Sequence, residues 1–151
     1  TGTRSSRRVR APQLGQEFSF QMPIGVTAVI AHMYVFDGAR LTEFAVRWTD
    51  ATDTLAYMDG LGGYTDFATG ISLFRGNTVF HTLKFVADPA SGLYVRAILD
   101  ATEYDLSAAS GMDTAFVVEP YMICEIHLDG VGGANSSIYV DDVIITQNEP
   151  A

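Results

Sequence analysis

The chain lacks most of the features that would place it in a special structural class. It contains one cysteine, Cys124, among 151 residues, so no internal disulfide can form, and we expect this side chain to pack as a small apolar group. The longest nearly apolar stretch, Val26–Phe36, is interrupted by Thr27 and His32 and falls short of the roughly 18 apolar residues that a membrane-spanning helix needs. The sequence therefore predicts neither a disulfide-stapled domain nor insertion into a membrane.

Basic residues are scarce outside the N-terminus. The chain has nine lysines and arginines against 18 aspartates and glutamates, a formal net charge of −9. Four of the basic residues lie in the first ten positions, which contain no acid: Arg4, Arg7, Arg8 and Arg10. The acidic remainder should repel phosphate backbones, so a nucleic acid is not expected as the main partner. We expect these arginines to dock onto an acidic neighbour, either another copy of the chain or another structural protein.

Apolar residues at helical spacing are also lacking after this arm. The chain instead consists of short segments in which apolar and polar residues alternate, separated by residues that favour turns, as is typical of β-strands. With 151 residues, 48% of them hydrophobic, there is enough apolar material for one continuous core. We therefore expect residues 1–12 to form a basic arm and residues 13–151 to form a single all-β domain.

The predicted strands are bounded by glycine, proline, asparagine and aspartate residues. They are Glu17–Met22, Val26–Asp37, Leu41–Asp50, Thr54–Asp59, Ile71–Arg75, Thr78–Asp88, Leu93–Asp100, Glu103–Leu106, Phe116–Val118, Tyr121–Asp129 and Ser137–Thr146. The glycine-rich segment 60–70 is expected to be a loop, and Ser107–Thr114 to be a loop or one short helical turn.

The hairpin His81–Asp100 is the clearest of these features. Its turn, Asp88–Gly92, combines a proline with a glycine that tolerates positive φ. Alternation along both strands predicts one core face and one wetter face, with Tyr94 and Arg96 on the wetter face. Trp48 has the apolar parity of its own strand and is expected in the core. Many such strands without crossover helices predict an antiparallel two-sheet β-sandwich.

Four segments of the chain resemble strands of concanavalin A-like sandwich modules. They are His81–Asp88, Gly92–Asp100, Glu103–Leu106 and the closing Ile138–Thr146. The resemblance implies a jelly-roll sandwich of the kind used by lectins, carbohydrate-binding modules, laminin-G-like domains and some virion proteins. Because these segments are strand patterns and not active-site signatures, the resemblance bears on fold more than on function.

Glycoside hydrolases of this fold are similar in carrying Glu-x-Asp-x-Glu on one strand. This chain has Glu103 and Asp105 at the first two acidic positions, but Ser107 replaces the final acid. Hydrolysis needs a proton donor and a nucleophile or base at a defined spacing. We therefore expect no catalytic residues and interpret the two acids as solvent-facing side chains of a short strand.

Two patterns could hold a cation, and each has an ordinary alternative. Glu125, His127 and Asp129 would share one face of a strand, where they could bind a divalent metal, act in acid–base chemistry or simply form the polar face. Two Asp-Gly-x-Gly-Gly loops could serve as turns alone or could supply calcium with oxygen ligands, which would be Asp59, Asp66, Asp129 and Asn135. We expect no metal site and no cofactor, with calcium as the open alternative.

Glycan binding would require exposed aromatic rings beside polar side chains. Tyr64 and Phe67 in the glycine-rich loop fit this requirement best, followed by Tyr94 and Arg96 on the hairpin. The alternative for the two loop aromatics is that they fold back to cap the sandwich.

Together these patterns favour a non-catalytic structural or adhesive subunit of a larger surface assembly, of the virion decoration or extracellular fibre type. The basic arm would dock the subunit to its neighbours, and a location outside the cell or on a virion surface is favoured. The alternative is a carbohydrate-binding, lectin-like module. A glycan-cleaving enzyme that uses Glu103 and Asp105, or the face of Glu125, His127 and Asp129, is the least favoured function.

Overall fold

The computed structural model describes residues 13–131 and 137–149. The arginines of the predicted arm and the predicted calcium ligand Asn135 lie outside these ranges: Arg4, Arg7, Arg8 and Arg10 precede them, and Asn135 falls in the gap. The described residues form strands and connecting loops without a helix, so none of them makes a helix able to cross a membrane.

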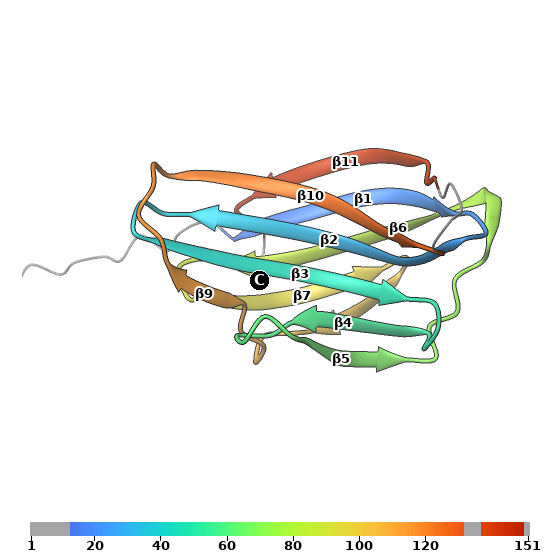
Figure 1. Ribbon diagram of the computed structural model, residues 1–151, viewed down its shortest axis with the longest axis horizontal. Coiled ribbons are helices and arrows are strands. Elements are labelled where there is room, and N and C mark those ends of the chain that lie inside the picture. Colours follow the sequence, from blue (N-terminus) through green and yellow to red (C-terminus); the bar gives the residue numbers. More distant parts are fainter. Residues whose placement is uncertain (1–12, 132–136, 150–151) are drawn as a thin grey trace, which may run out of the picture.

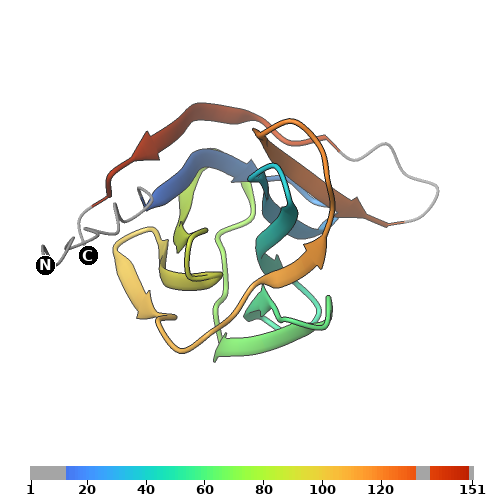
Figure 2. The same cartoon turned by 90° about the vertical axis from the view of Figure 1, so that its left-hand side faces the viewer.

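Two antiparallel sheets face each other (Figures 1 and 2). Sheet A has five strands in the order β11-β1-β6-β7-β8, and sheet B has six, in the order β10-β2-β3-β4-β5 with β9 paired to β3. The strands are β1 (Leu14–Met22), β2 (Val26–Phe36), β3 (Arg40–Thr49), β4 (Thr54–Met58), β5 (Tyr64–Thr69), β6 (Gly76–Asp88), β7 (Leu93–Leu99), β8 (Thr102–Asp105), β9 (Met112–Ala115), β10 (Tyr121–Gly130) and β11 (Val140–Gln147). The predicted all-β, antiparallel two-sheet sandwich is confirmed.

The core lies between the two sheets and is rich in aromatic side chains. Phe18, Phe20 and Phe85 enter it from sheet A, and Phe44 and Trp48 enter it from sheet B; all are at most 1% exposed. The alternation that predicted a buried Trp48 is confirmed. Its indole Nε1 donates a hydrogen bond to the carbonyl of residue 71 at 2.8 Å, which satisfies its only polar group.

Two connections differ from the prediction. Residues 64–69 form strand β5 because the preceding turn is tight: Gly62 has φ of +80°, and the Asp59 carboxylate accepts hydrogen bonds from the N–H groups of Leu61 and Gly63. Ile71–Arg75 is not a strand. This segment carries the chain from β5 in sheet B to β6 in sheet A, so no neighbouring strand runs beside it for pairing. Only an isolated bridge forms at its end, between Arg75 and Met22.

A third difference lies between β8 and β10. Phe116–Val118 was expected to be a strand, but β9 consists of Met112–Ala115, whose first three residues belong to the region expected to be a loop or helical turn. It pairs with the first residues of β3, from Arg40 to Glu43. An ion pair between Arg40 and Asp113 reinforces this pairing, with Arg40 Nε 2.7 Å from the carboxylate.

The predicted orientation of Tyr94 is wrong. Val86 pairs with Arg96 and Ala87 pairs with Tyr94, so β7 has one extra residue, Val95, at this point. Such a bulge reverses the alternation of side chains on one side of it. Tyr94 therefore points into the core, where it is 1% exposed, and it cannot offer its ring to a ligand at the surface.

The outer face of sheet A carries an ion cluster that holds the end of the described chain. Glu149 is only 8% exposed and accepts hydrogen bonds from Lys84 Nζ at 2.9 Å, from an Arg96 guanidinium nitrogen at 3.4 Å and from the Thr146 hydroxyl. The hydrogen bond from Thr146, together with the contacts with Lys84 and Arg96, outweighs the opposing effect of burial and holds the pKa of Glu149 below its usual value. Arg96 is therefore engaged with carboxylates of the same chain.

We expect Glu149→Gln to reduce the free energy of unfolding at pH 7 by about 1.5 kcal/mol, the scale of a hydrogen bond to a charged group. Because the folded pKa lies below the unfolded value of roughly 4.3, this contribution is complete above that pH and is lost as the pH falls through the folded pKa. Urea unfolding of both proteins at pH 7 and in a series down to pH 3 measures this effect. A difference between them that persists unchanged at pH 3 would contradict the assignment.

Candidate functional site

The outer face of sheet B carries a cluster of polar side chains. In β2, Val29, Ala31 and Met33 point into the core, so the intervening His32 and Tyr34 point outward. By the same alternation β3 contributes Glu43, and β10 contributes Glu125 and His127. We call these five outward-facing residues the polar cluster: His32, Tyr34, Glu43, Glu125 and His127.

Strand register brings the members of the polar cluster together. His32 is the direct cross-strand partner of Glu125 on β10, and Tyr34 is the direct partner of Glu43 on β3. His127 follows Glu125 by two residues and therefore lies on the same face. Because β2 is paired along most of its length with both neighbours, the positions of these side chains are set by regular sheet geometry.

Short contacts link the side chains of the polar cluster. His127 Nε2 and Glu125 Oε2 are 2.6 Å apart, and Tyr34 Oη and His32 Nδ1 are 3.2 Å apart. The other nitrogen of the same ring, His32 Nε2, lies 3.4 Å from Glu43 Oε2. The rings of His32 and Tyr34 stack with centroids 4.1 Å apart.

Burial controls the charge of His32. Its side chain is 12% exposed, and burial, followed by repulsion from His127, lowers its pKa to about 4, although Glu125 opposes the shift. The imidazole is therefore neutral at pH 7, and its contact with Glu43 is not an ion pair at that pH. Burial also raises the pKa of Glu43 and of Tyr34.

This arrangement combines two imidazoles with carboxylates on an accessible surface. One possible donor atom each from His32, Glu125 and His127 lies within 4.8 Å of the other two. The sequence predicted that Glu125 and His127 share a face, but the structure adds His32 from the adjacent strand in place of Asp129. The sequence analysis missed His32 because its closeness to Glu125 and His127 depends on the pairing of β2 with β10. The only local signal was a histidine at an outward-facing position of a mostly apolar strand.

The four residues predicted to bind a glycan are not brought together. Tyr64 lies on the outer face of sheet B, and the Arg47 guanidinium carbon is 3.9 Å from its ring centroid. Phe67 packs against the core and contacts the rings of Tyr57 and Tyr104. Tyr94 and Arg96 belong to sheet A. Tyr94 is buried in the core, and Arg96 is part of the ion cluster around Glu149.

The predicted calcium ligands are also dispersed. The Asp59 carboxylate accepts hydrogen bonds from two N–H groups of its own loop and from the Thr65 hydroxyl at 3.3 Å. Within residues 13–131 and 137–149, Asp59, Asp66 and Asp129 do not form a group of three donors close enough to share an ion. The Asp-Gly-x-Gly-Gly pattern around Asp59 therefore serves the turn between β4 and β5.

The acids that resemble part of a hydrolase motif lie on β8, an edge strand of sheet A. The Glu103 side chain is 63% exposed, with Arg96 Nε 3.9 Å away. Asp105 accepts a hydrogen bond from the N–H of Ser107 at 2.8 Å, and this contact lowers the pKa of its carboxyl. Both acids therefore lie at the surface, as predicted.

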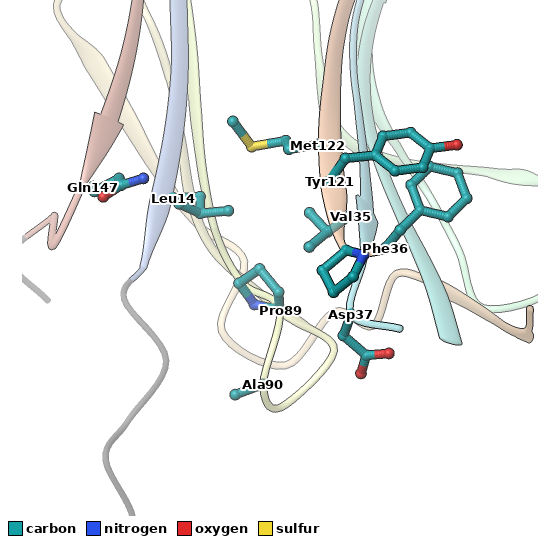
Figure 3. A pocket seen from close by; sticks show the side chains of 10 residues that line it. Leu14, Val35, Phe36, Asp37, Pro89, Ala90, Tyr121, Met122 and Gln147 are labelled. Carbon is teal, nitrogen blue, oxygen red and sulfur yellow. The ribbon is translucent and has the colours of Figure 1, made fainter. Parts of the chain in front are cut away.

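A second notable surface is a groove between the ends of the two sheets (Figure 3). It has a volume of about 520 Å³. Leu14 and Gln147 form one wall, Val35, Phe36, Tyr121 and Met122 form the other, and Pro89 and Ala90 lie at its end. The Phe36 and Tyr121 rings stack with centroids 4.1 Å apart. Most of the lining is therefore apolar, with Asp37 and Gln147 as its polar members.

Met122, which lines the groove, lies on β10, and β10 and β11 are the edge strands of their two sheets (Figure 1). Val140 and Ile145 pair with buried residues of β1, and Met122 pairs with Val35 of the core, so all three point toward the space between the sheets. They nevertheless remain 36% to 39% exposed. We call Met122, Val140 and Ile145 the open seam.

Further exposed apolar side chains flank the open seam. On β10 they are Tyr121 and Ile123, and on β11 they are Val143 and Ile144, with exposures from 38% to 57%. Exposed apolar side chains along sheet edges are typical of sites that contact another molecule.

Comparisons of the chain with protein-family models, with curated proteins and with solved structures found no match.

Proposed function

We propose that the chain is a non-catalytic structural subunit of a larger surface assembly and that it associates with a second copy of itself through the open seam. The observation that carries this proposal is the exposure of apolar side chains on two adjacent edge strands, including three that point toward the sandwich interior. Covering them removes apolar surface from water, the dominant favourable contribution to most protein association.

Side-chain packing, and not continuous strand addition, is expected to form this contact. The pairing of β11 with β1 shifts register between residues 141 and 144, where Asp142 has φ of +51°. A bulge of this kind interrupts the row of backbone groups that an incoming strand would need. An apolar patch, by contrast, is complementary to the same patch on another copy related by a two-fold axis.

The place where the basic arm joins the sandwich supports a second copy as the occupant. The N–H of Glu149 donates to the carbonyl of Gln13 at 3.4 Å, so residues 1–12 join the described structure beside the end of β11. The four arginines of the arm are attached to the sandwich through Gln13, near one end of β11. A neighbouring copy, whose body is acidic, offers carboxylates for them.

Val143→Lys is expected to weaken self-association about 10- to 30-fold, the scale of an interface hot spot. Val143 is 57% exposed, so the substitution leaves the fold intact while it places a charge beside the open seam. Ile123→Lys makes the same change on β10. Sedimentation equilibrium of the full chain should give twice the 16.4 kDa mass for the unmodified protein and a shift toward the single-chain mass for both variants.

Leu61→Lys is the matched control, because Leu61 is 95% exposed in the turn between β4 and β5, outside the open seam and its flanks. It should keep the mass of the unmodified protein. A single-chain mass for the unmodified protein at all concentrations, or an equal loss of association in the Leu61 variant, would contradict the proposed interface.

The proposal includes the finer description of the sandwich as a jelly roll of the concanavalin A-like kind. Two features support it: β1 and β2 follow each other in the chain but belong to different sheets, and the closing strand β11 pairs with β1. The expected location outside the cell or on a virion surface belongs to the same proposal.

A further inference from the structure

Two imidazoles and a carboxylate on the outer face of sheet B form a set of metal-binding groups. Their donor atoms lie within 4.8 Å of one another, and they come from two adjacent strands. We propose that His32, Glu125 and His127 form a binding site for a divalent transition-metal ion of the Zn²⁺ class.

The types of donor decide the class of ion. Imidazole nitrogen suits zinc and other late first-row metals, whereas calcium and magnesium prefer shells made of oxygen. Two histidines and one carboxylate are a ligand set that zinc uses in proteins, and they leave one position of a tetrahedral ion for water or another ligand. The proposed site therefore differs, in both its residues and its ion, from the calcium site that the two Asp-Gly-x-Gly-Gly loops were considered able to form.

The site is built on strands, so its ligands are held before an ion arrives. His32 and Glu125 are direct partners in the β2–β10 ladder, whose register is uninterrupted from Tyr121 to Asp129. His127 lies two residues from Glu125 on the same face, with ring centroids of His127 and His32 5.7 Å apart. Small rotations of side chains, without movement of the backbone, would bring the three donors onto one ion.

Neighbouring groups orient His32 as a ligand. The Tyr34 hydroxyl lies 3.2 Å from His32 Nδ1, and Glu125, the direct cross-strand partner of His32, lies on the same face. On the other side of the ring, Nε2 lies 3.4 Å from Glu43 Oε2 without forming a hydrogen bond to it. A carboxylate beside the second nitrogen is the usual partner that positions a metal-binding histidine.

The third histidine provides an internal contrast. His81 is 6% exposed, and both of its ring nitrogens are engaged: Nδ1 with Asp100 Oδ2 at 2.9 Å and Nε2 with the Phe74 carbonyl at 3.2 Å. These two hydrogen bonds connect the open end of the hairpin, at Asp100, to the loop that contains Phe74. His32 and His127, by comparison, meet on an accessible face.

Isothermal titration of the chelator-treated full chain with ZnCl₂ tests the site. We expect one ion bound per chain, and a loss of affinity of at least about 100-fold in His127→Ala and in Glu125→Gln, each of which removes a ligand. Both residues are more than 40% exposed at their side chains, so these variants should fold. Asp129→Asn is the matched control, because it removes a neighbouring exposed carboxylate of β10 outside the ligand set, and it should bind zinc as the unmodified chain does.

Two further variants separate this site from adventitious binding to surface groups. Glu43→Gln should lower zinc affinity about 10- to 100-fold because it weakens the positioning of His32. His32→Gln should lower zinc affinity at least as much as His127→Ala does. Circular dichroism checks that the His32 variant is folded. Visible absorption of the Co²⁺ complex should show a four-coordinate ion. No zinc binding by the unmodified chain, or equal affinity in the His127 and Asp129 variants, would overturn the proposal.

Discussion

Tyr94→Phe is expected to lower the free energy of unfolding by about 3 kcal/mol, although it removes a single oxygen atom. The Tyr94 hydroxyl accepts a hydrogen bond from the N–H of Ala45 at 2.8 Å. Its one O–H hydrogen has two acceptors within reach, the carbonyl oxygen of Met58 at 3.0 Å and that of Ala45 at 3.1 Å. All of these groups are buried, so phenylalanine would leave them without partners.

The cause of this sensitivity is a junction in sheet B. The strand β3 pairs with β9 over Arg40–Glu43 and with β4 over Val46–Thr49. Between these two ladders, the polar backbone groups of Ala45 have no strand partner on that side. Tyr94, which comes from sheet A across the core, supplies the missing hydrogen bonds and thereby joins the two sheets.

Urea unfolding of the Tyr94 variant at pH 7, followed by tryptophan fluorescence, measures the expected loss. Tyr104→Phe is the matched control, since Tyr104 is a partly buried tyrosine on β8 that contacts the Phe67 ring. It should change stability by less than about 0.5 kcal/mol, as substitutions away from buried hydrogen bonds usually do. Equal stabilities of the two variants would show that the junction does not depend on the hydroxyl.

Gly111→Ala is expected to cost about 3 kcal/mol, the upper part of the range for overpacked cores. A methyl group at this position would lie 2.5 Å from the carbonyl oxygen of Glu43 and 2.8 Å from the Phe44 ring. The glycine cannot easily retreat, because its N–H is bonded to the carbonyl of Gly92 at 2.9 Å. The clash would fall at the same junction of β3.

Gly60→Ala is the control for the intrinsic effect of exchanging glycine for alanine. Its added methyl group would meet only the Ser110 hydroxyl, at 3.2 Å, and the carbonyl of Gly111, at 3.7 Å. Thermal unfolding should place the Gly60 variant within a few degrees of the unmodified chain and the Gly111 variant well below it. A Gly111 variant as stable as the Gly60 variant would mean that β3 and β9 can separate without penalty.

The fold class was predictable because alternation along a strand is a local property. The hairpin His81–Asp100 and the buried Trp48 follow from parity and turn residues alone. Tyr94 shows the limit of this reasoning: one extra residue at Val95 reverses the side on which it lies, and nothing in the local pattern marks the bulge. Strands β5 and β9 were missed for a related reason, since short segments become strands only when a neighbouring edge is available to pair with them.

The candidate sites were predictable only in part. Parity placed Glu125 and His127 on one face, which the structure confirms. Adding His32 required the knowledge that β10 pairs with β2, a contact between segments about 90 residues apart that depends on tertiary structure. The open seam was invisible in the sequence, because alternation predicts which way Ile145 points but not whether the opposite sheet reaches far enough to cover it.

The strand order has a consequence for how the chain folds during its synthesis. Sheet B needs β9 and β10, which are made after all but one of the strands of sheet A, and sheet A needs β11, the last of the described strands. Neither sheet can be completed before the last of the described strands in its order, β10 or β11, has been made. The hydrogen bonds of Tyr94 to Ala45, 49 residues earlier, can form only when the two sheets dock. With so many contacts between distant segments, folding should be slow and should finish as a single late event.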